Sequence, residues 1–517
     1  MKTIDPSHLS EEAAFKSLPL TENNLRRLAN ARPDTWKNPK PASIYNLVVI
    51  GGGSAGLLSA IVAAGLGGKV ALIEKHLMGG DCLNVGCVPS KAIIRSARVM
   101  GEIRSAHKFG IETNGSKVHF DQVMERIRKV QADISHVDSV WRYSEAGVDV
   151  FLGEGQFVGP NTIEVGGERF RFKKAVVATG SRPFHPPIPG LKEAGFLTNE
   201  TVWNLVEQPK RLALIGGGPI GCELAQAFHR LGSEVTLFHN AGHILNREDA
   251  DAAEIVQNTF VEEGIKLVLN SQVMQVQVAN GEKIVSYKCA QEESQVTVDE
   301  ILVATGRVPN IEGLGLDQVG VNIDSKCGIV VNEYMQSSNP AIYAAGDVAM
   351  EYKFTHAAAA AAKIVVQNAL FFGRKKITDL KMPWCTYTDP EIAHVGLYEH
   401  DAEKQGIAID TFTIHFDEND RAMADGEPEG FVKVHTKKGT DKILGATIVA
   451  RQAGEMINEI TLAMVAGIGL KTIGEVIHPY PTQAEAIARV AGLYNRTRLT
   501  PTVQKLSGGL LALNRRG

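Results

Sequence analysis

Short apolar runs alternate with helix-like segments from Asn46 onward. Residues 46–50 (NLVVI) and 69–74 (KVALIE) have the continuous apolar character of buried strands, and residues 57–65 (LLSAIVAAG) between them are typical of a helix. The same order of strand, glycine-rich turn, helix and strand returns at residues 211–238. Strands that alternate with helices in this way predict a parallel α/β sheet, and the repetition predicts a duplicated βαβ unit.

The pattern changes after residue 380. Residues 431–436 (FVKVHT) and 442–450 (KILGATIVA) are typical of strands, and residues 455–467 (EMINEITLAMVAG) are typical of a helix. We therefore expect a separate α+β domain there. At the other end, the polar residues 1–43 contain one amphipathic stretch around residues 20–30, and we expect a short helix within a partly ordered appendage.

One uncharged stretch of 22 residues, Leu47 to Gly68, is long enough to cross a bilayer. Seven of these residues are glycines in a phosphate-loop pattern, so we expect a buried strand, turn and helix instead. The first residues contain no apolar run typical of a secretory signal. We therefore expect neither a membrane partner nor secretion.

The composition is that of an ordinary soluble protein of 517 residues with a formal net charge of −4. No run of Lys and Arg stands out, so nucleic acid is not an expected partner. Four of the six cysteines are scattered singly; they are Cys222, Cys289, Cys327 and Cys385. Scattered cysteines indicate a reducing compartment, and we expect a cytoplasmic protein.

Two glycine motifs follow the first strands of the two βαβ units. The first is Gly51-x-Gly53-x-x-Gly56, with Glu74 at the end of the next strand. Such glycines let the backbone approach a pyrophosphate at a helix N-terminus, and the acid can accept hydrogen bonds from ribose hydroxyls. The second motif is Gly216-x-Gly218-x-x-Gly221. Both predict dinucleotide sites.

The second motif lacks an acid at the end of its second strand. His239 and Asn240 stand there. A carboxylate would repel a 2′-phosphate, so its absence favours NADPH over NADH without excluding NADH. His239, His243 and Arg247 are candidate phosphate partners, and each is equally well explained as a solvated loop residue.

Cys82 and Cys87 form a close pair within residues 79–91, GGDCLNVGCVPSK. Structural zinc needs four ligands in closely spaced pairs, and the sequence has no second such pair. An inert disulfide fits poorly with a reducing compartment. Gly86 allows an unusual turn, and Pro89-Ser90 suggests a helix start just after Cys87, where the dipole would lower the pKa of a thiol. These features favour a redox-active pair.

Residues 79–91 resemble the redox-active segment of the class I pyridine-nucleotide disulfide oxidoreductases. This family includes dihydrolipoamide dehydrogenase, glutathione reductase and mercuric reductase. Further matching segments occur in the family's order, and they are AVVATGSRP (175–183), ILVATGRVPN (301–310), AIYAAGDVA (341–349), YTDPEIAHVGLYE (387–399) and PTQAE (481–485). The resemblance covers about residues 44–500. Within the family, the mercuric reductase-like members are the most similar to this sequence.

The resemblance implies an α/β fold with two Rossmann-like domains, which bind FAD and NAD(P)H, and a C-terminal α+β dimerisation domain. The expected segments are an N-terminal extension (1–43), the first part of the FAD-binding domain (44–195), the NAD(P)H-binding domain (196–317), the second part of the FAD-binding or central domain (318–379), the dimerisation domain (380–500) and a C-terminal tail (501–517). The family is homodimeric, and its active site is shared between subunits.

The resemblance also implies roles for single residues. Cys87 would face the flavin, and Cys82 would meet the substrate. Lys91 would lie beside the flavin N5 and pair with Glu223, because a cation stabilises reduced flavin. Asp347 would contact the ribityl or phosphate part of FAD. The other expected cofactor-binding residues beyond the glycine motifs are Ser54, Ala55, Lys75, Gly80, Asp81, Thr179, Gly180, Gly306, Arg307 and Gly346.

The C-terminal segment HPYPTQAE bears on the substrate. Disulfide-reducing members carry a His directly before this Pro-Thr, oriented by the Glu, as the acid/base. Here Tyr480 stands at that position and His478 lies two residues earlier. Tyrosine is a poor base at neutral pH, and a tyrosine there is similar to mercuric reductase. Glu485 is a candidate catalytic residue or part of a capping box with Thr482.

Two departures from mercuric reductase stand against this resemblance. Those enzymes typically end with vicinal cysteines and often carry an N-terminal metal-binding domain, whereas this chain has no cysteine after Cys385 or within residues 1–43. Cys82 and Cys87 would then be the transient Hg(II) ligands, since soft thiolates bind soft metal ions. Cys385 is a third candidate thiol, although burial as a small apolar residue explains it better. No structural metal site is expected.

Taken together, the sequence predicts a homodimeric FAD enzyme that passes electrons from NADPH, or from NADH, through FAD and the Cys82–Cys87 pair to a soft metal ion such as Hg(II). One alternative is a dihydrolipoamide dehydrogenase-like or other small-disulfide reductase, in which His478 replaces the missing His. Another is a flavoprotein redox sensor or complex subunit that docks through residues 1–43.

Overall fold

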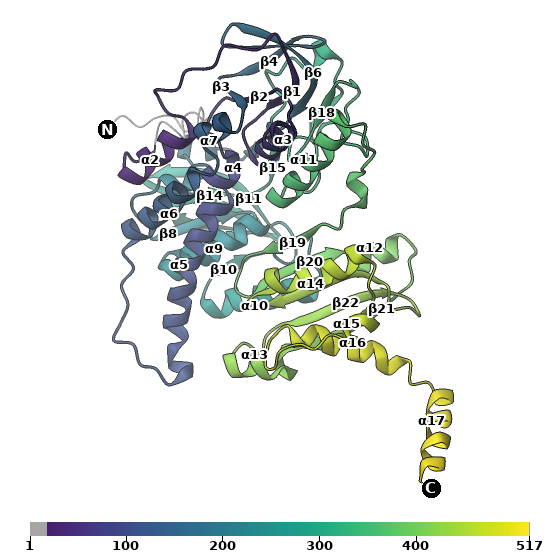
Figure 1. Ribbon diagram of the computed structural model, residues 1–517. Coiled ribbons are helices and arrows are strands. Elements are labelled where there is room, and N and C mark those ends of the chain that lie inside the picture. Colours follow the sequence, from purple (N-terminus) through teal and green to yellow (C-terminus); the bar gives the residue numbers. More distant parts are fainter. Residues whose placement is uncertain (1–17, 516–517) are drawn as a thin grey trace. The chain divides into compact units, whose positions relative to one another are not determined.

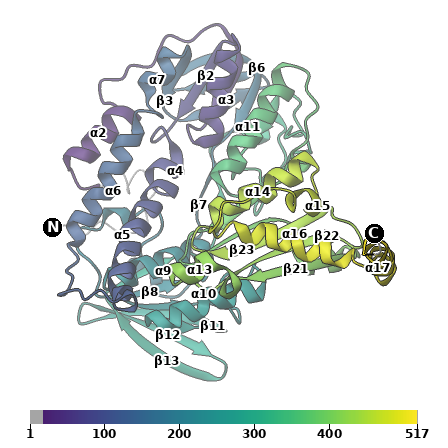
Figure 2. The same ribbon diagram turned by 60° about the horizontal axis from the view of Figure 1, so that its bottom comes forward.

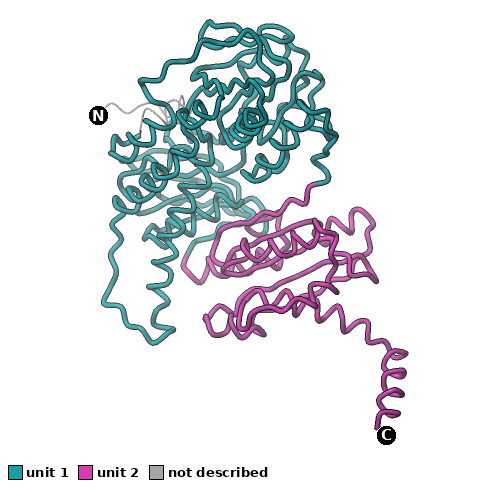
Figure 3. The backbone as a smooth tube through the Cα atoms, viewed as in Figure 1, with its two compact units in different colours: residues 1–242, 265–379 teal, residues 243–264, 380–517 magenta. Residues whose placement is uncertain are grey.

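The computed structural model describes residues 18–515 and contains two compact units (Figure 3). The first unit comprises Met1–Gly242 and Ile265–Asp379, and the second comprises His243–Gly264 and Leu380–Gly517. Each unit has its own sheets and its own hydrophobic core. The mixed α/β architecture expected from the sequence is confirmed.

The main sheet of the first unit has seven strands in the order β3-β2-β1-β6-β5-β4, with β18 beside β6. The strands are β1 (Ile44–Ile50), β2 (Val70–Glu74), β3 (Val148–Leu152), β4 (Gly155–Gly159), β5 (Thr162–Val165), β6 (Glu168–Val177) and β18 (Ile342–Ala344). β1 runs parallel to β2 and β6. Helix α3 (Ser54–Gly65) joins β1 to β2, and α11 (Thr355–Leu370) packs beside it (Figure 1). The expected strand, turn and helix between residues 47 and 68 are therefore confirmed.

A second parallel sheet carries the second glycine motif, in the order β10-β9-β8-β14. Its elements are β8 (Arg211–Ile215), α9 (Pro219–Leu231), β9 (Glu234–Phe238), β10 (Lys266–Val268) and β14 (Glu300–Val303). An antiparallel sheet follows, made of β11 (Ser271–Ala279), β12 (Glu282–Cys289) and β13 (Glu292–Val298). The predicted duplication of a βαβ unit is confirmed, since β8, α9 and β9 repeat the arrangement of β1, α3 and β2.

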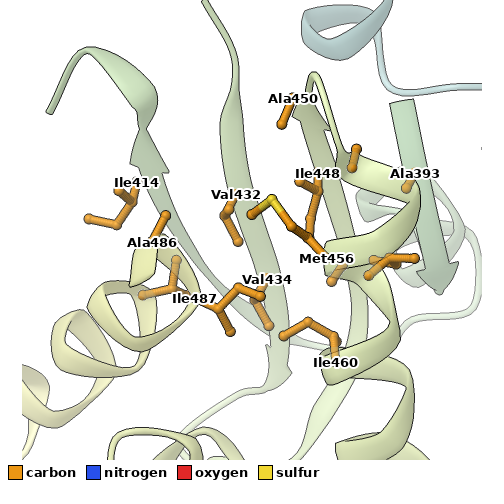
Figure 4. Packing of buried hydrophobic residues seen from close by; sticks show 14 of the residues in the cluster. Ala393, Ile414, Val432, Val434, Ile448, Ala450, Met456, Ile460, Ala486 and Ile487 are labelled. Carbon is orange, nitrogen blue, oxygen red and sulfur yellow. The ribbon is translucent and has the colours of Figure 1, made fainter. Parts of the chain in front are cut away.

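The second unit is built on a five-stranded antiparallel sheet in the order β19-β20-β23-β22-β21. Its strands are β19 (Pro383–Thr386), β20 (Glu391–Gly396), β21 (Ile409–His415), β22 (Phe431–Lys437) and β23 (Ile443–Ala450). Helices α14 (Ala453–Ala466) and α16 (Glu485–Thr497) cover one face, and their apolar side chains form one core with those of the strands (Figure 4). Burying one such Val or Ile side chain stabilises the fold by about 1.5–3 kcal/mol.

Residues 243–264 pack in this second unit although they follow β9 in the chain. Glu248 accepts a hydrogen bond from Trp384 at 2.9 Å. Lys433 forms ion pairs with Asp249 and Asp251 at 2.9 and 2.7 Å. These contacts hold the segment and its helix α10 (Ala250–Glu263) against the C-terminal sheet.

Several further elements are short or peripheral. They are α7 (Val140–Glu145), β7 (Ser181–Pro183), α8 (Leu191–Ala194), β15 (Arg307–Pro309), β16 (Ile323–Asp324), β17 (Gly328–Ile329), α12 (Glu399–Lys404), α13 (Asp420–Asp425), α15 (Leu470–Ile473) and the exposed α17 (Pro501–Asn514).

The N-terminal region differs from the expectation. The predicted helix is present as α2 (Glu22–Ala31), and the hydroxyl of Thr21 accepts a hydrogen bond from the Asn24 N–H at its start. The expectation of a partly ordered appendage is wrong for residues 18–43, because α2 packs against α6 (Phe120–Ser135) (Figure 1). The rest of the predicted extension, residues 1–17, lies outside the described part of the chain.

Candidate active site: the cysteine pair and the two dinucleotide motifs

Cys82 and Cys87 lie on two successive helices of the first unit. Cys82 is in the single turn α4 (Gly80–Asn84), and Cys87 is the first residue of α5 (Cys87–Ser105). The helix thus starts two residues before the predicted Pro89-Ser90. A Cβ on Gly86 would lie 2.9 Å from the Asp81 carbonyl oxygen, so the tight connection requires glycine. The structure holds both cysteines as free thiols, and Cys87 is exposed.

The two thiols have opposite tendencies to ionise. A hydrogen bond from the Cys82 thiol, assisted by Thr355 and Lys91, lowers the pKa of Cys87 to about 6. The same hydrogen bond, together with burial, raises the pKa of Cys82. A hydrogen bond donated to a thiolate favours the charged form, and so does the N-terminal end of a helix. The reduced pair therefore carries its negative charge on Cys87 at neutral pH.

Thr355 is a member of this site that the sequence did not reveal. Its hydroxyl oxygen lies 3.3 Å from the Sγ of Cys87. Thr355 is the first residue of α11, so the N-terminus of a second helix lies near the sulfur. A threonine that opens an alanine-rich helix carries no distinctive sequence signal, and only the fold brings it to Cys87.

Lys91 and Glu223 form the ion pair that the resemblance implied. The Nζ of Lys91 lies 2.8 Å from Oε2 of Glu223. Lys91 is one helical turn beyond Cys87 on α5, and Glu223 lies on the first turns of α9, behind the second glycine motif. The carboxylate is nearly buried and the ammonium is partly exposed, with 8% and 37% of the side chains accessible. The pair links the cysteine helix to the second nucleotide motif.

The first glycine motif is closed by Glu74. Its carboxylate accepts hydrogen bonds from the N–H groups of Gly52 and His76 at 2.5 and 2.6 Å. A Cβ on Gly56 would lie 1.8 Å from the carbonyl oxygen of Gly51, so α3 approaches β1 as only glycine permits. This close approach and the N-terminus of α3 fit the pyrophosphate of FAD, and the ribose-binding role of Glu74 stays a prediction.

The second glycine motif has the same backbone arrangement, but a histidine replaces the acid at the end of its second strand. A Cβ on Gly221 would lie 1.9 Å from the Gly216 carbonyl oxygen, and a Cβ on Gly218 would meet no atom within 4 Å. His239 makes the hydrogen bond that corresponds to the one from Gly52 to Glu74, because its Nδ1 accepts a hydrogen bond from the Gly217 N–H at 3.1 Å. This site also fits a dinucleotide, and its closing residue is an imidazole. Asn240 beside it is exposed.

Several other predicted cofactor residues lie together around Asp347. Ser181 donates a hydrogen bond to Asp347 at 2.7 Å and accepts one from Nε of Arg307 at 2.7 Å. Arg307 also pairs with Asp81, which precedes Cys82. Thr179 donates to the Asn310 carbonyl at 2.7 Å. This network connects the segment of Cys82 to residues of β7 and β15 and to the residues that follow β18.

Of the other predicted cofactor residues, Ser54 and Ala55 begin α3, and Lys75 is exposed after β2. Gly80, Gly180, Gly306 and Gly346 all have positive φ angles. His243 and Arg247 belong to the second unit.

The C-terminal candidates lie in the second unit. Tyr480 is 70% exposed and donates a hydrogen bond to Asp420 at 2.8 Å, which raises the pKa of its hydroxyl. The Nε2 of His478 lies 3.0 Å from Glu459.

The capping-box interpretation of Glu485 is wrong. Helix α16 starts at Glu485 itself, and the hydroxyl of Thr482 donates to the Pro479 carbonyl at 2.9 Å instead of capping the helix.

Two family models match the chain. The model described as pyridine nucleotide-disulphide oxidoreductase matches residues 45–362, and the model of the dimerisation domain of that family matches residues 382–491. The chain belongs to the pyridine nucleotide-disulphide oxidoreductase family. The resemblance found in the sequence is thus confirmed, and FAD and NAD(P)H are the typical cofactors of this family. The dimerisation domain indicates self-association.

Two kinds of oxidoreductase in this family are similar to the chain to nearly the same degree. Mercuric reductase of Staphylococcus aureus is 34% identical over 452 residues, which cover 87% of this chain and 83% of that protein. Dihydrolipoyl dehydrogenase of Thermus scotoductus is 37% identical over 462 residues, which cover 86% and 96%. These identities establish the family and leave the substrate class open.

Solved structures of family members share the fold. The HOCl-induced flavoprotein disulfide reductase RclA from Escherichia coli is 27% identical with a TM-score of 0.77, covering 87% of this chain and all of that chain. LpdA from Mycobacterium tuberculosis is 27% identical with a TM-score of 0.80, covering 88% and 100%. The family fold expected from the sequence is therefore confirmed.

Among residues 18–515, none of the helices combines the length and the apolar character that a membrane span requires. The same residues contain no group of three or more His, Cys, Asp or Glu side chains arranged to hold a metal ion.

Proposed function

We propose that the protein is a mercuric reductase-like enzyme that uses NADPH to reduce a soft metal ion such as Hg(II). The balanced reaction is NADPH + Hg²⁺ → NADP⁺ + Hg⁰ + H⁺, in which the metal ion takes up both electrons. Bound FAD would supply the step that accepts a hydride and passes an electron pair to the disulfide. The residues described above would hold the cofactors and the thiols.

The cysteine pair supplies the metal ligands in this proposal. Cys87 carries the thiolate and Cys82 keeps its proton in the free pair. A soft ion that binds both sulfurs would displace that proton, because thiolates are the preferred ligands of soft metals. Lys91 and Glu223, paired at 2.8 Å, would fix a positive charge near the cofactor where negative charge develops.

The observation that carries this choice is Tyr480. It occupies the position at which disulfide-reducing members have their acid/base His, and its hydroxyl is hydrogen-bonded to Asp420. The raised pKa means that even less of this hydroxyl is ionised at neutral pH than in a free tyrosine, so a phenolate base is less available. Metal reduction by a dithiol releases no substrate thiolate that an acid must protonate, so the absence of His before Pro481 is tolerated by that substrate class.

One observation favours a second candidate, a small-disulfide reductase. His478 lies 3.0 Å from Glu459, and a His oriented by a carboxylate is the arrangement that thiol–disulfide exchange requires. Only 7% of the His478 side chain is accessible, which argues against a substrate contact within one subunit. The third hypothesis, docking of a partner through residues 1–43, stays a prediction, and within the described part of that segment α2 packs on its own chain.

A homodimer with a shared active site is part of this proposal. Besides the dimerisation-domain match, the second unit exposes large apolar side chains at Leu462, Val465 and Ile477, with accessible fractions of 67%, 67% and 95%. Such a surface suits a protein interface. Cytoplasmic location likewise stays a prediction.

The test is NADPH oxidation by the purified holoenzyme with Hg(II) in excess thiol. Lipoamide, glutathione disulfide and Cu(II) serve as parallel substrates. The proposal expects Hg(II)-dependent turnover that is abolished in Cys82→Ser and Cys87→Ser. If Hg(II) gives no rate above the oxidase background while a disulfide is turned over, the second candidate replaces the first.

A further inference from the structure

The N-terminal helix α2 is attached to the helix that lies behind the cysteine segment. Asn23 donates a hydrogen bond to Glu125 of α6 at 2.7 Å, and Asn30 donates one to Ser135 at 2.9 Å. Figures 1 and 2 show α2 alongside α6. The family model begins at residue 45, so this helix lies outside the matched residues.

One side chain of α2 reaches the cysteine turn itself. Arg27 is 2% exposed, and its Nη1 lies 3.5 Å from the carbonyl oxygen of Asn84, the last residue of α4. Gln131 of α6 donates to the same carbonyl at 2.7 Å and to that of Leu83 at 3.0 Å. The last carbonyls of a helix lack partners within it, and a cation beside them is favourable. Donors from two helices therefore hold the end of the turn that carries Cys82.

The chain that leads into this turn is held by the same N-terminal segment. The N–H of Met78 donates to the carbonyl of Ala31 at 3.1 Å. Nη1 of Arg32 donates to the carbonyls of Lys75 and His76, at 2.7 and 2.8 Å. The segment thus contacts the connection between β2 and α4 at residues 75, 76 and 78, and it contacts α4 itself at Asn84.

Arg27 is an unusual residue to bury. Burial, with the neighbouring Arg128, lowers the pKa of its guanidinium to about 10, so the group is still charged at neutral pH. A buried charge is costly unless polar groups satisfy it. At Gly86 the backbone that follows α4 passes close to α4, since a Cβ there would lie 2.9 Å from the Asp81 carbonyl oxygen. The turn that carries Cys82 is therefore closely packed against the chain that follows it.

We propose that residues 19–38 form a brace for the redox turn, with Arg27 as the positioning residue that keeps Cys82 against Cys87. This inference rests on the redox role proposed above for the cysteine pair. Arg27 contacts Asn84 and Gln131 shares that contact, so the effect reaches Cys82 through the backbone of α4. A disulfide that opens and closes in every cycle needs its two sulfurs returned to bonding distance, and a fixed turn supplies that proximity.

The experiment compares Arg27→Gln and Arg27→Lys with Arg26→Ala in the FAD-loaded full-length protein. Arg26 is the matched control, because it lies on the same helix and pairs with Asp133 on the exposed side. Each protein is assayed for NADPH-driven reduction of an artificial one-electron acceptor, for turnover of its thiol-dependent substrate, and for the pH midpoint of its thiolate absorbance.

In Arg27→Gln we expect the artificial-acceptor rate to stay within about twofold of wild type. We expect thiol-dependent turnover to fall by about tenfold and the thiolate midpoint to move to higher pH, because Cys82 no longer donates well to Cys87. Arg27→Lys should recover part of the thiol-dependent turnover and part of the shift of the thiolate midpoint. Arg26→Ala should match wild type in all three measurements.

Arg32→Ala is the second variant, since Arg32 is only partly buried, and it should show a smaller change of the same kind. If Arg27→Gln fails to retain FAD, the thiol-dependent turnover and the thiolate midpoint of Arg27→Lys and Arg32→Ala are compared with those of Arg26→Ala instead. The brace is refuted if the variants that fold behave like Arg26→Ala. A wild-type protein with no thiolate absorbance would instead refute the redox role of the pair.

Discussion

The sulfur of Cys87 lies 3.3 Å from the hydroxyl of Thr355, a residue 268 positions further along the chain. The contact places the candidate electron-transfer thiol between the N-termini of α5 and α11. Removing the hydroxyl in Thr355→Val should cost about 1–3 kcal/mol of thiolate stabilisation, which raises the pKa of Cys87 by about one to two pH units.

The measurement for Thr355→Val is the pH dependence of the thiolate absorbance in the anaerobically reduced holoenzyme. Thr355→Ser retains the hydroxyl and serves as the control, with a midpoint close to that of wild type. An unchanged midpoint in Thr355→Val would show that this hydrogen bond does not tune Cys87.

The wild-type enzyme should lose its thiolate absorbance in acid. The pKa of Cys87 is lowered to about 6, so the thiolate is present above that pH and becomes protonated below it. An ordinary thiol would still be protonated at neutral pH. Absorbance scans between pH 5 and about pH 9 on the reduced enzyme test this, since a midpoint above about 8 would contradict the assignment of the charge to Cys87.

The ion pair between Lys91 and Glu223 contributes to stability as well as to chemistry. Lys91→Met leaves a nearly buried carboxylate without its cation. Because the Lys91 side chain is partly exposed, we expect the free energy of unfolding to fall by only about 1–2 kcal/mol. The double variant Lys91→Met with Glu223→Leu should recover this loss. Thermal unfolding of all three proteins with bound FAD provides the comparison.

His239 should control the choice of coenzyme. His239 accepts a hydrogen bond from the second glycine motif as Glu74 does from the first, and its imidazole carries no negative charge that would repel a 2′-phosphate. His239→Glu should lower kcat/KM for NADPH relative to NADH by about tenfold or more, or about 1.4 kcal/mol. His239→Gln is the uncharged control. Equal effects on both coenzymes would mean that His239 only shapes the loop.

Tyr480 and His478 separate the two candidate substrate classes. Under metal reduction, His478→Ala should leave Hg(II)-dependent turnover nearly unchanged. Under disulfide reduction, the same variant should lower turnover of lipoamide by about 10²-fold, because it removes the acid/base that Glu459 orients. Tyr480→Phe provides the matched comparison, and a loss in Tyr480→Phe alone would count against a role of His478.

Parts of the site that are continuous in sequence were predictable. The glycine motifs with Glu74 lie within one βαβ unit, and Cys82 and Cys87 are five positions apart, so spacing and the surrounding strand–helix pattern indicated them. The pairing of Lys91 with Glu223 connects segments that belong to the two copies of the duplicated βαβ arrangement. Only the family resemblance indicated this pairing. The fold class followed from strand–helix alternation, which depends on local sequence.

Other parts depend on contacts that no local pattern shows. Thr355 opens an ordinary alanine-rich helix, and its importance arises from where α11 packs. Arg27 lies in a polar segment whose composition suggested a tail, because one buried arginine does not change the average of its neighbours. The capping box failed since α16 begins at Glu485 itself, and helix ends are the least predictable boundaries.

The central claim is that Cys82 and Cys87 form a redox pair coupled to the flavin. Its most direct test is an anaerobic NADPH titration of the holoenzyme, followed by absorbance. We expect two-electron reduction to produce the long-wavelength absorbance that a thiolate gives beside oxidised flavin, and Cys87→Ser to abolish it. Cys82→Ser should show this absorbance before any NADPH is added. A wild-type titration without this absorbance, or its persistence in Cys87→Ser, would contradict the account.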